Sequence, residues 1–284
     1  MAIRIITDSA ADYSAQEIEK RQITCIPMTV TFGDKEYMDG KDITKDEFFK
    51  LLTEGKDFPK TSQPSPSNFL ECFEEAKEAG DSVIAILISS ALSGTFQNAV
   101  LAKSMADYEN IFIVDSKIAT LGMRILVDRA VKLRDAGRSA QEIVNEVENL
   151  RPRLRLFAGL DTLEYLAKGG RLSKTSAALG NLANLKPIIT FTPEGNVSLC
   201  GKQMGIRHAC KQVAKLTMAD APDMDCPLYL LYAYDQKNCA AFLHMLQKNG
   251  LNLESPKVRG IGPIIGTHIG TGAFGIVYVA KETE

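Results

Sequence analysis

Hydroxyl side chains follow one apolar run of the sequence in a pattern that suits the binding of an anion. The run 82–88 leads directly into Ser89-Ser90-Ala91-Leu92-Ser93-Gly94-Thr95, and a helical pattern begins near Gly94. We expect this stretch at the carboxyl end of a buried parallel strand, where open α/β sheets bind ligands. Its hydroxyls and the free N–H groups of a helix N-terminus would hold a negative charge there. Ordinary helix capping is the alternative, but capping needs only one of these hydroxyls.

Two further stretches combine polar side chains with turn-forming residues. The segment 60–66 contains Thr61 and Ser62 and ends in Ser65-Pro66, a signal for the start of a helix. The segment 262–270 is rich in glycine and holds His268. Taken singly, the first is typical of a loop that ends in a helix cap, and the second of a loop with a solvated histidine.

A short helical pattern over residues 163–172 presents an arginine after a tight turn. We expect a helix capped at Asp161 that stops at Gly169-Gly170 and leaves Arg171 on display. A solvated arginine after a helix stop is one interpretation. Docking of an acidic group on Arg171 is the other.

The spacing of ligating residues and glycines argues against a metal or a cofactor. His208, His244 and His268 lie far apart, and none forms a Cys/His cluster of the kind that binds zinc. The stretch 270–275 matches G-x-G-x-x-G, but a dinucleotide site also needs a following helix and an acidic residue about 20 positions later. No phosphate-binding G-x-x-x-x-G-K-S/T loop occurs. We expect no metal and no cofactor.

Composition indicates a globular cytoplasmic protein. Hydrophobic residues make up 45% of the 284 residues and charged residues 24%, with a net charge of -2. This balance argues against nucleic-acid or membrane-surface binding, which need an excess of basic residues. No targeting segment and no run long enough for membrane insertion is visible. The six cysteines lack a C-x-x-C pair, so we expect reduced thiols.

Strand and helix signals alternate through the first half of the chain, which predicts a three-layer α/β/α domain with a parallel sheet over residues 1–150. Strands are expected at 3–7, 23–32, 82–88 and 111–114. Helices are expected after the capping signals at Thr44, Ser65 and Ser139, with stops at Gly80, Gly137 and Leu150.

The run Arg151-Pro152-Arg153-Leu154-Arg155 marks a change of composition and the expected domain boundary. Residues 151–284 then mix helices with a hairpin, formed by 187–191 and 197–200 around a Pro-Glu-Gly-Asn turn. Further strands are expected at 228–234 and 275–280. We therefore predict a second α/β domain with a mixed sheet.

In order and spacing, these stretches resemble the DegV family of bacterial fatty-acid-binding proteins over essentially the whole chain. The resemblance implies two α/β domains, a long-chain fatty acid in the core of one, and the carboxylate near the domain interface. It also implies a non-catalytic, lipid-carrying subunit that serves phospholipid metabolism. The motifs that carry the resemblance are, in chain order, 7–12, 61–65, 89–95, 115–116, 163–172 and 266–270.

The resemblance assigns roles to individual residues. Thr61 and Ser93 are implied to bond the carboxylate through their hydroxyls, with the Gly94 N–H, Ser62 and His268 beside it. Arg171 and Arg207 are implied to face a separate, ATP-dependent fatty-acid kinase subunit that forms the acyl phosphate. Burial of about 0.8 kcal/mol per methylene gives a long acyl chain ample affinity for such a carrier.

Two other functions compete with this one. A serine hydrolase would use Ser93 as nucleophile and His268 as base, but the sequence around Ser93 lacks the first glycine of G-x-S-x-G and offers no acid for the histidine. A small-molecule sensor of a carboxylate, or a protein-interaction domain docking through Arg151, Arg153 and Arg155, is the second.

Overall fold

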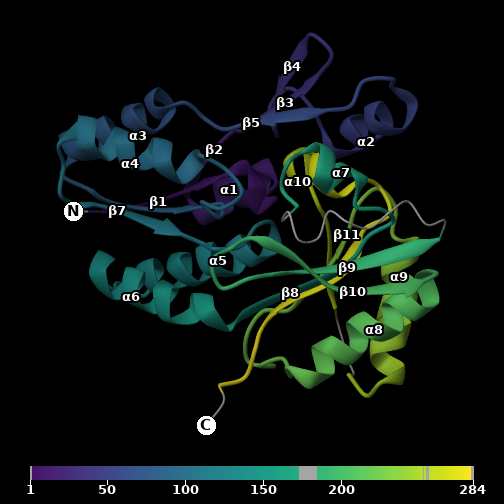
Figure 1. Cartoon of the computed structure of the whole chain (residues 1–284). Helices are drawn as coiled ribbons and strands as arrows, with labels where there is room; N and C mark the ends of the chain where they lie inside the picture. The colour runs from purple at the N-terminus through teal and green to yellow at the C-terminus, as the bar shows by residue number, and fades with distance from the viewer. Residues whose placement is uncertain (1, 173–183, 252, 254–255, 283–284) are drawn as a thin grey trace.

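The computed structural model describes residues 2–172, 184–251, 253 and 256–282, and its first main sheet is parallel (Figure 1). The strand order is β2-β1-β6-β7, and every neighbouring pair runs in the same direction. All six residues of β6 are buried, as expected for the central part of a parallel sheet covered on both faces. The strands are β1 (Ile3–Asp8), β2 (Ile23–Ile26), β6 (Ser82–Leu87) and β7 (Ile111–Asp115).

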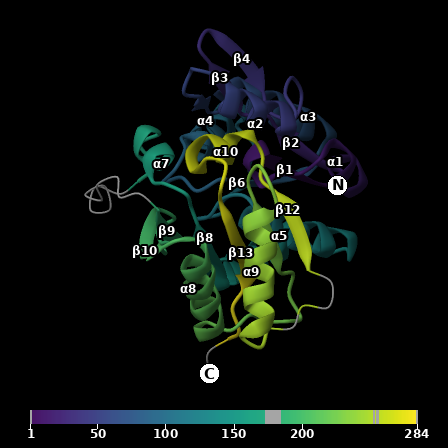
Figure 2. The same cartoon turned by 90° about the vertical axis from the view of Figure 1, so that its right-hand side faces the viewer.

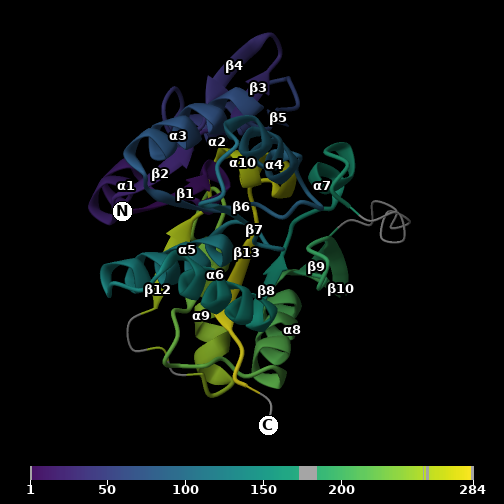
Figure 3. The same ribbon diagram turned by 90° about the vertical axis from the view of Figure 1, so that its left-hand side faces the viewer.

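Helices cover both faces of this sheet and confirm the three-layer arrangement (Figures 1 and 3). Side chains alternate along a strand, so Ile6, Val83 and Ala85 pack with one helix pair while Ile5 and Ile84 pack with the other. The first pair is α3 (Pro66–Ala79) and α4 (Thr95–Ala106), and the second is α5 (Leu121–Asp135) and α6 (Ala140–Leu150).

Local capping rules set where several helices begin and end. Thr44 and Ser139 form capping boxes at the starts of α2 (Lys45–Glu54) and α6. Gly80 ends α3 in the left-handed conformation, with φ of 68°. The predicted starts and stops are confirmed at these positions. A further helix, α1 (Ala15–Arg21), begins with a capping box at Ser14.

The single strand expected over 23–32 is wrong, because the chain changes sheets in the middle. β2 ends at Ile26, and β3 (Thr29–Phe32) belongs to a three-stranded antiparallel sheet with β4 (Lys35–Met38) and β5 (Lys60–Ser62). Pro27 lies at the break; it has no N–H to continue a ladder.

The second main sheet is mixed, as predicted. Its order is β10-β9-β8-β13-β11-β12, with all pairs antiparallel except β11 with β12. The helices α8 (Ile206–Ala219) and α9 (Lys237–Lys248) cover one face (Figure 2). The strands are β8 (Leu154–Gly159), β9 (Leu185–Phe191), β10 (Val197–Met204), β11 (Tyr229–Tyr232), β12 (Lys257–Gly260) and β13 (Phe274–Val279).

The helix α5 lies between the two main sheets and joins their cores (Figure 1). Nine of its residues are buried, and one hydrophobic cluster runs from Ile5 and Ile84 through α5 to Leu156 and Val277. The predicted boundary at 150/151 falls where α6 ends and the chain enters the mixed sheet. Among the described residues, no helix is long and apolar enough to cross a membrane.

Candidate functional site

A cavity of about 370 Å³ lies between the mixed sheet and the elements above it. The sheet presents to it the face opposite α8 and α9, since Leu156 and Ala158 line the cavity while Phe157 packs beneath α8 and α9. The opposite walls come from β5, the loop after β6, the start of α5 and the helix α10 (Pro263–Ile269). Apolar lining from the sheet and the turn after it includes Leu156, Ala158, Ile189, Val197, Leu231 and Ile261.

Thr61, Ser62, Ser93 and His268 all line this cavity, so the structure brings together four of the predicted ligand-binding residues. They come from β5, from the loop between β6 and α4, and from α10. Ser62 and its neighbour Gln63 are exposed, which places this polar lining at the surface.

His268 lies on α10, not in a loop, so its predicted setting is wrong. Its Nε2 is 2.9 Å from Thr61 Oγ1, and its Nδ1 is buried with no hydrogen-bond partner among the described residues. Burial, and to a lesser extent the positive charge of Arg171, lowers the pKa of His268 to about 4. At neutral pH the imidazole is therefore uncharged, with one nitrogen to donate and one to accept.

The four hydroxyl residues after β6 have different partners, and Ser93 is the one of them that lines the cavity. Ser89 donates to Gly195 O at 2.8 Å, and Ser90 donates to Asp115 Oδ2 at 2.5 Å. Thr95 is buried, with its Oγ1 2.8 Å from Ser93 Oγ. The prediction that all four form one anion site is therefore wrong, because three of them fix the loop itself.

The Gly94 N–H donates to the side chain of Gln63, 2.9 Å from its Oε1. A Cβ at position 94 would lie only 2.4 Å from that amide, so glycine permits the close approach of β5 to this loop. Sequence reasoning missed Gln63, although it lies inside the turn-rich segment 60–66. Thr61, Gln63 and Ser93 thus all contribute to the polar edge of the cavity.

Arg171 is half-buried and lines the cavity. Its Nε donates to Leu92 O at 3.1 Å, which joins the segment after α7 (Glu164–Lys168) to the loop that carries Ser93. The expected cap at Asp161 is wrong, since α7 begins after Leu163 and Asp161 pairs with Lys186 at 2.6 Å.

Arg207 is exposed in the first turn of α8 and is not part of the cavity lining. Arg153 and Arg155, considered above as a docking face, pair within the chain with Asp223 and Asp220.

The arrangement does not suit a hydrolase. His268 Nε2 contacts Thr61 and not Ser93, and no described carboxylate meets the imidazole. With a pKa of about 4, His268 would be a weak base for activating a serine. The glycines at 270–275 lead into the strand β13, so they do not form a dinucleotide site.

A family model described as an uncharacterised protein of the DegV family matches residues 2–281. The chain belongs to the DegV family. A DegV domain-containing protein of Caldanaerobacter subterraneus subsp. tengcongensis is 36% identical, covering 98% of this chain and 99% of the relative. The fold of this chain is the one seen in solved DegV structures.

Solved structures of the same fold are described as fatty-acid binding. The DegV family protein from Thermus thermophilus, described as fatty-acid binding, has a TM-score of 0.88 at 33% identity and covers 99% of this chain and 100% of its own. A stearic acid-binding protein from Eubacterium ventriosum has a TM-score of 0.83 at 28% identity, with 99% of each chain covered.

Proposed function

We propose that this DegV protein binds a long-chain fatty acid, with the acyl chain in the cavity and the carboxylate at Thr61 and Ser93. The observation that carries the proposal is the division of the cavity lining. Its walls are apolar over the mixed sheet and α10, and hydroxyl and imidazole groups line it where it reaches the surface. An amphiphile with one small anionic head matches such a lining, and solved relatives are described as fatty-acid binding.

The energetics suit a chain of many methylenes. Each buried methylene contributes about 0.8 kcal/mol, so most of the affinity would come from contact of the acyl chain with the apolar walls. At the head group, a neutral His268 that donates from Nε2 to Thr61 Oγ1 leaves the Thr61 hydroxyl free to donate to the carboxylate. Ser93 supplies a second hydroxyl, and the half-buried Arg171 adds a positive charge nearby.

The proposal includes presentation of the head group to a separate ATP-dependent kinase subunit. Exposure of Ser62 and Gln63 beside the cavity supports it, because a carboxylate held there would be close to solvent. Hydroxyl donors leave the carboxylate oxygens less tightly held than a bidentate arginine would. Arg171 at this edge and the exposed Arg207 are the candidates for contacts with the kinase.

Lipid extraction tests the binding step. Protein expressed in a bacterial host would be denatured, extracted and examined by mass spectrometry, and we expect a stoichiometric long-chain fatty acid. Thr61→Val and Ser93→Ala should weaken binding of added fatty acid, because each removes a head-group donor. Ser104→Ala is the matched control, since Ser104 is exposed on α4 and does not line the cavity. An empty protein that takes up no added fatty acid would contradict the proposal.

Acyl phosphate formation with a bacterial fatty-acid kinase subunit tests presentation. We expect Arg171→Ala and Arg207→Ala to raise the concentration of carrier needed for half-maximal rate. Lys215→Ala, at another exposed position on α8, should not change it. If the arginine variants match the wild type, the assignment of these residues to partner contact is wrong.

A further inference from the structure

The segment Thr7–Asp12 lines no part of the cavity, yet its polar atoms hold several of the cavity walls. Asp8 Oδ2 accepts from the N–H of Ile88 at 2.8 Å, and Ser9 Oγ accepts from the N–H of Met28 at 3.1 Å. Ile88 and Met28 both line the cavity. The function proposed above assigns no role to this segment.

Asp12 joins two walls that are far apart in the sequence. One carboxylate oxygen accepts from the Thr120 hydroxyl at 2.5 Å, and the other accepts from the Gly262 N–H at 2.6 Å. Thr120 lines the cavity at the start of α5, and Gly262 is the residue from which α10 begins. The carboxylate therefore fixes the N-terminus of α10 relative to α5.

The position of His268 depends on the position of the N-terminus of α10. It is six residues beyond Gly262 on a helix of seven residues, so a shift at the start of α10 moves the imidazole as well. Thr61 lies on β5 of the three-stranded sheet, so its contact with His268 holds only if α10 stays in place. Lys45 Nζ supports the same junction by donating to Gly260 O at 2.6 Å.

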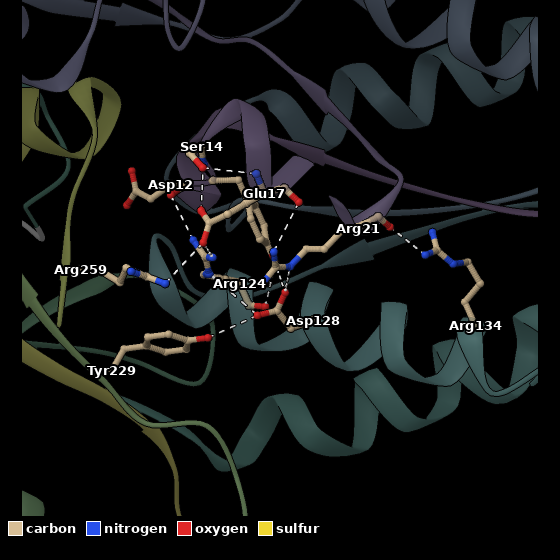
Figure 4. A network of polar contacts seen from close by, with 10 residues as sticks. Asp12, Ser14, Glu17, Arg21, Arg124, Asp128, Arg134, Tyr229 and Arg259 are labelled. Atoms are coloured by element: carbon tan, nitrogen blue, oxygen red, sulfur yellow. Dashed lines mark hydrogen bonds and ion pairs between the residues drawn. The ribbon is translucent and has the colours of Figure 1, made fainter. Parts of the chain in front are cut away.

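Asp12 is itself held firmly (Figure 4). Arg124, which is 1% exposed, donates from Nη1 to Asp12 O at 3.3 Å and pairs with Glu17. Asp12 has φ of 59°, a left-handed conformation that aspartate tolerates better than most residues. Arg124 thus holds the Asp12 backbone while the carboxylate bonds Thr120 and Gly262.

We propose that Asp12 is a positioning residue for the head-group site, acting through Gly262 and α10 to hold His268 against Thr61. This inference rests on the proposed function for its effect on a ligand. Its effect on His268 is independent of any ligand.

Nuclear magnetic resonance of the full chain in solution tests the proposal through two signals, one from His268 and one from a bound ligand. In delipidated protein, the His268 ring signals report the Thr61 contact. In protein loaded with [1-¹³C]palmitic acid, the carboxyl signal and its pH titration report the head-group hydrogen bonds. We expect Asp12→Ala to shift both signals and to raise the carboxyl's proton affinity about tenfold, because a loosened donor stabilises the carboxylate less.

Two variants separate positioning from general loss of stability. Asp12→Asn keeps an acceptor for Gly262 and a polar group for Thr120, so it should restore both signals towards the wild type. Gly262→Ala places a Cβ 2.7 Å from Asp12 Oδ1 at a backbone conformation that alanine adopts freely, so it should reproduce the effect if Asp12→Ala does not fold. Ser139→Ala, which removes the distant cap of α6, serves as the stability control.

The outcomes distinguish this inference from the proposed function. Unchanged His268 signals in Asp12→Ala or Gly262→Ala would overturn the inference whether or not palmitate binds. Failure of the wild type to take up palmitate, with the His268 signals shifted as expected in the variants, would overturn the proposed function alone.

Discussion

The head-group end of the cavity and the network around Arg124 are both polar, but they use their hydrogen-bonding groups differently. In the network, Arg124 meets Glu17, Asp128 and the Tyr13 ring, so opposite charges compensate one another (Figure 4). Arg124 Nε makes no hydrogen bond among the described residues, but it lies 3.9 Å from the Asp128 carboxylate, which compensates its charge. At the head-group end the hydroxyls and the imidazole are neutral, Arg171 adds a positive charge, and His268 Nδ1 has neither a hydrogen-bond partner nor an opposite charge among the described residues. Unused capacity beside an apolar cavity indicates a binding site, whereas compensated charge indicates a structural junction.

Filling the cavity should separate the two regions most clearly. Ala158→Phe would place a phenyl ring against the space proposed for the acyl chain, because Ala158 lines the cavity from β8. Displacing about five methylenes would cost about 4 kcal/mol, or roughly a thousandfold in affinity. Isothermal titration of delipidated protein with palmitic acid measures this loss.

A matched control overfills the core elsewhere. Ala102 is fully buried on α4, on the far side of the parallel sheet from the cavity. Ala102→Phe should lower stability by about 1–3 kcal/mol and leave fatty-acid affinity unchanged. Equal affinities for the two variants would show that the cavity does not hold the ligand.

The network should respond in stability. Arg124→Met removes a charge that is 1% exposed and leaves Glu17 and Asp128 partly buried without it. We expect the free energy of unfolding in urea to fall by about 3 kcal/mol. The exposed pair of Arg138 with Glu142 is the comparison, and Arg138→Met should cost less than about 1 kcal/mol. Similar losses for both would mean that the network contributes no more than a surface ion pair.

The neutral imidazole predicts a pH effect of definite sign. The folded pKa of His268, about 4, lies below its ordinary value, so the unfolded chain takes up a proton first as pH falls. The contribution of neutral His268 to the free energy of unfolding is complete above about pH 6.5. It declines between about pH 6.5 and 4 and changes no further below that range. His268→Gln cannot titrate, so it should gain up to about 3 kcal/mol relative to wild type across that window.

Urea unfolding of both proteins over this pH range measures the difference. Burial raises the pKa of Asp8 and of Asp39 to about 7, which gives a pH dependence of the opposite sign. Both aspartates are present in both proteins, so their effect cancels in the comparison. A difference that stays constant with pH would mean that His268 titrates near its ordinary pKa.

The sequence predicted the elements better than it predicted the directions of their side chains. The apolar run of β6 and the caps of α2, α3 and α6 follow from local rules and are confirmed. Which hydroxyl after β6 turns towards the cavity depends on packing against Gly195 and Asp115, residues distant in the chain. Local patterns carry no signal for such contacts.

The glycines around His268 misled the prediction of a loop for a physical reason. Gly266 lies on α10 where a Cβ would come 2.7 Å from Phe48, so glycine serves close packing there and not chain flexibility. The bond between Asp12 and Gly262 spans 250 positions of the chain and was likewise out of reach. The domain division at 150/151 stays a prediction.

Thr120 lies at the boundary between the network around Arg124 and the cavity, so its substitution tests which of the two its hydroxyl serves. Its hydroxyl donates to Asp12, while the residue also lines the cavity. Thr120→Val should cost about 1–2 kcal/mol of stability, because one Asp12 oxygen loses its donor in a buried site. Fatty-acid affinity should change less than about threefold, since Gly262 still holds Asp12 and a methyl group suits the lining.

The matched variant is Thr217→Val, a buried threonine on α8 whose hydroxyl bonds only the backbone oxygen of Val213. It should be close to neutral in urea unfolding, because that oxygen keeps its helical partner. If Thr120→Val weakened palmitate binding tenfold with little loss of stability, the Thr120 hydroxyl would act on the ligand itself. Thr120 would then belong with Thr61 and Ser93, and the junction would begin at Asp12.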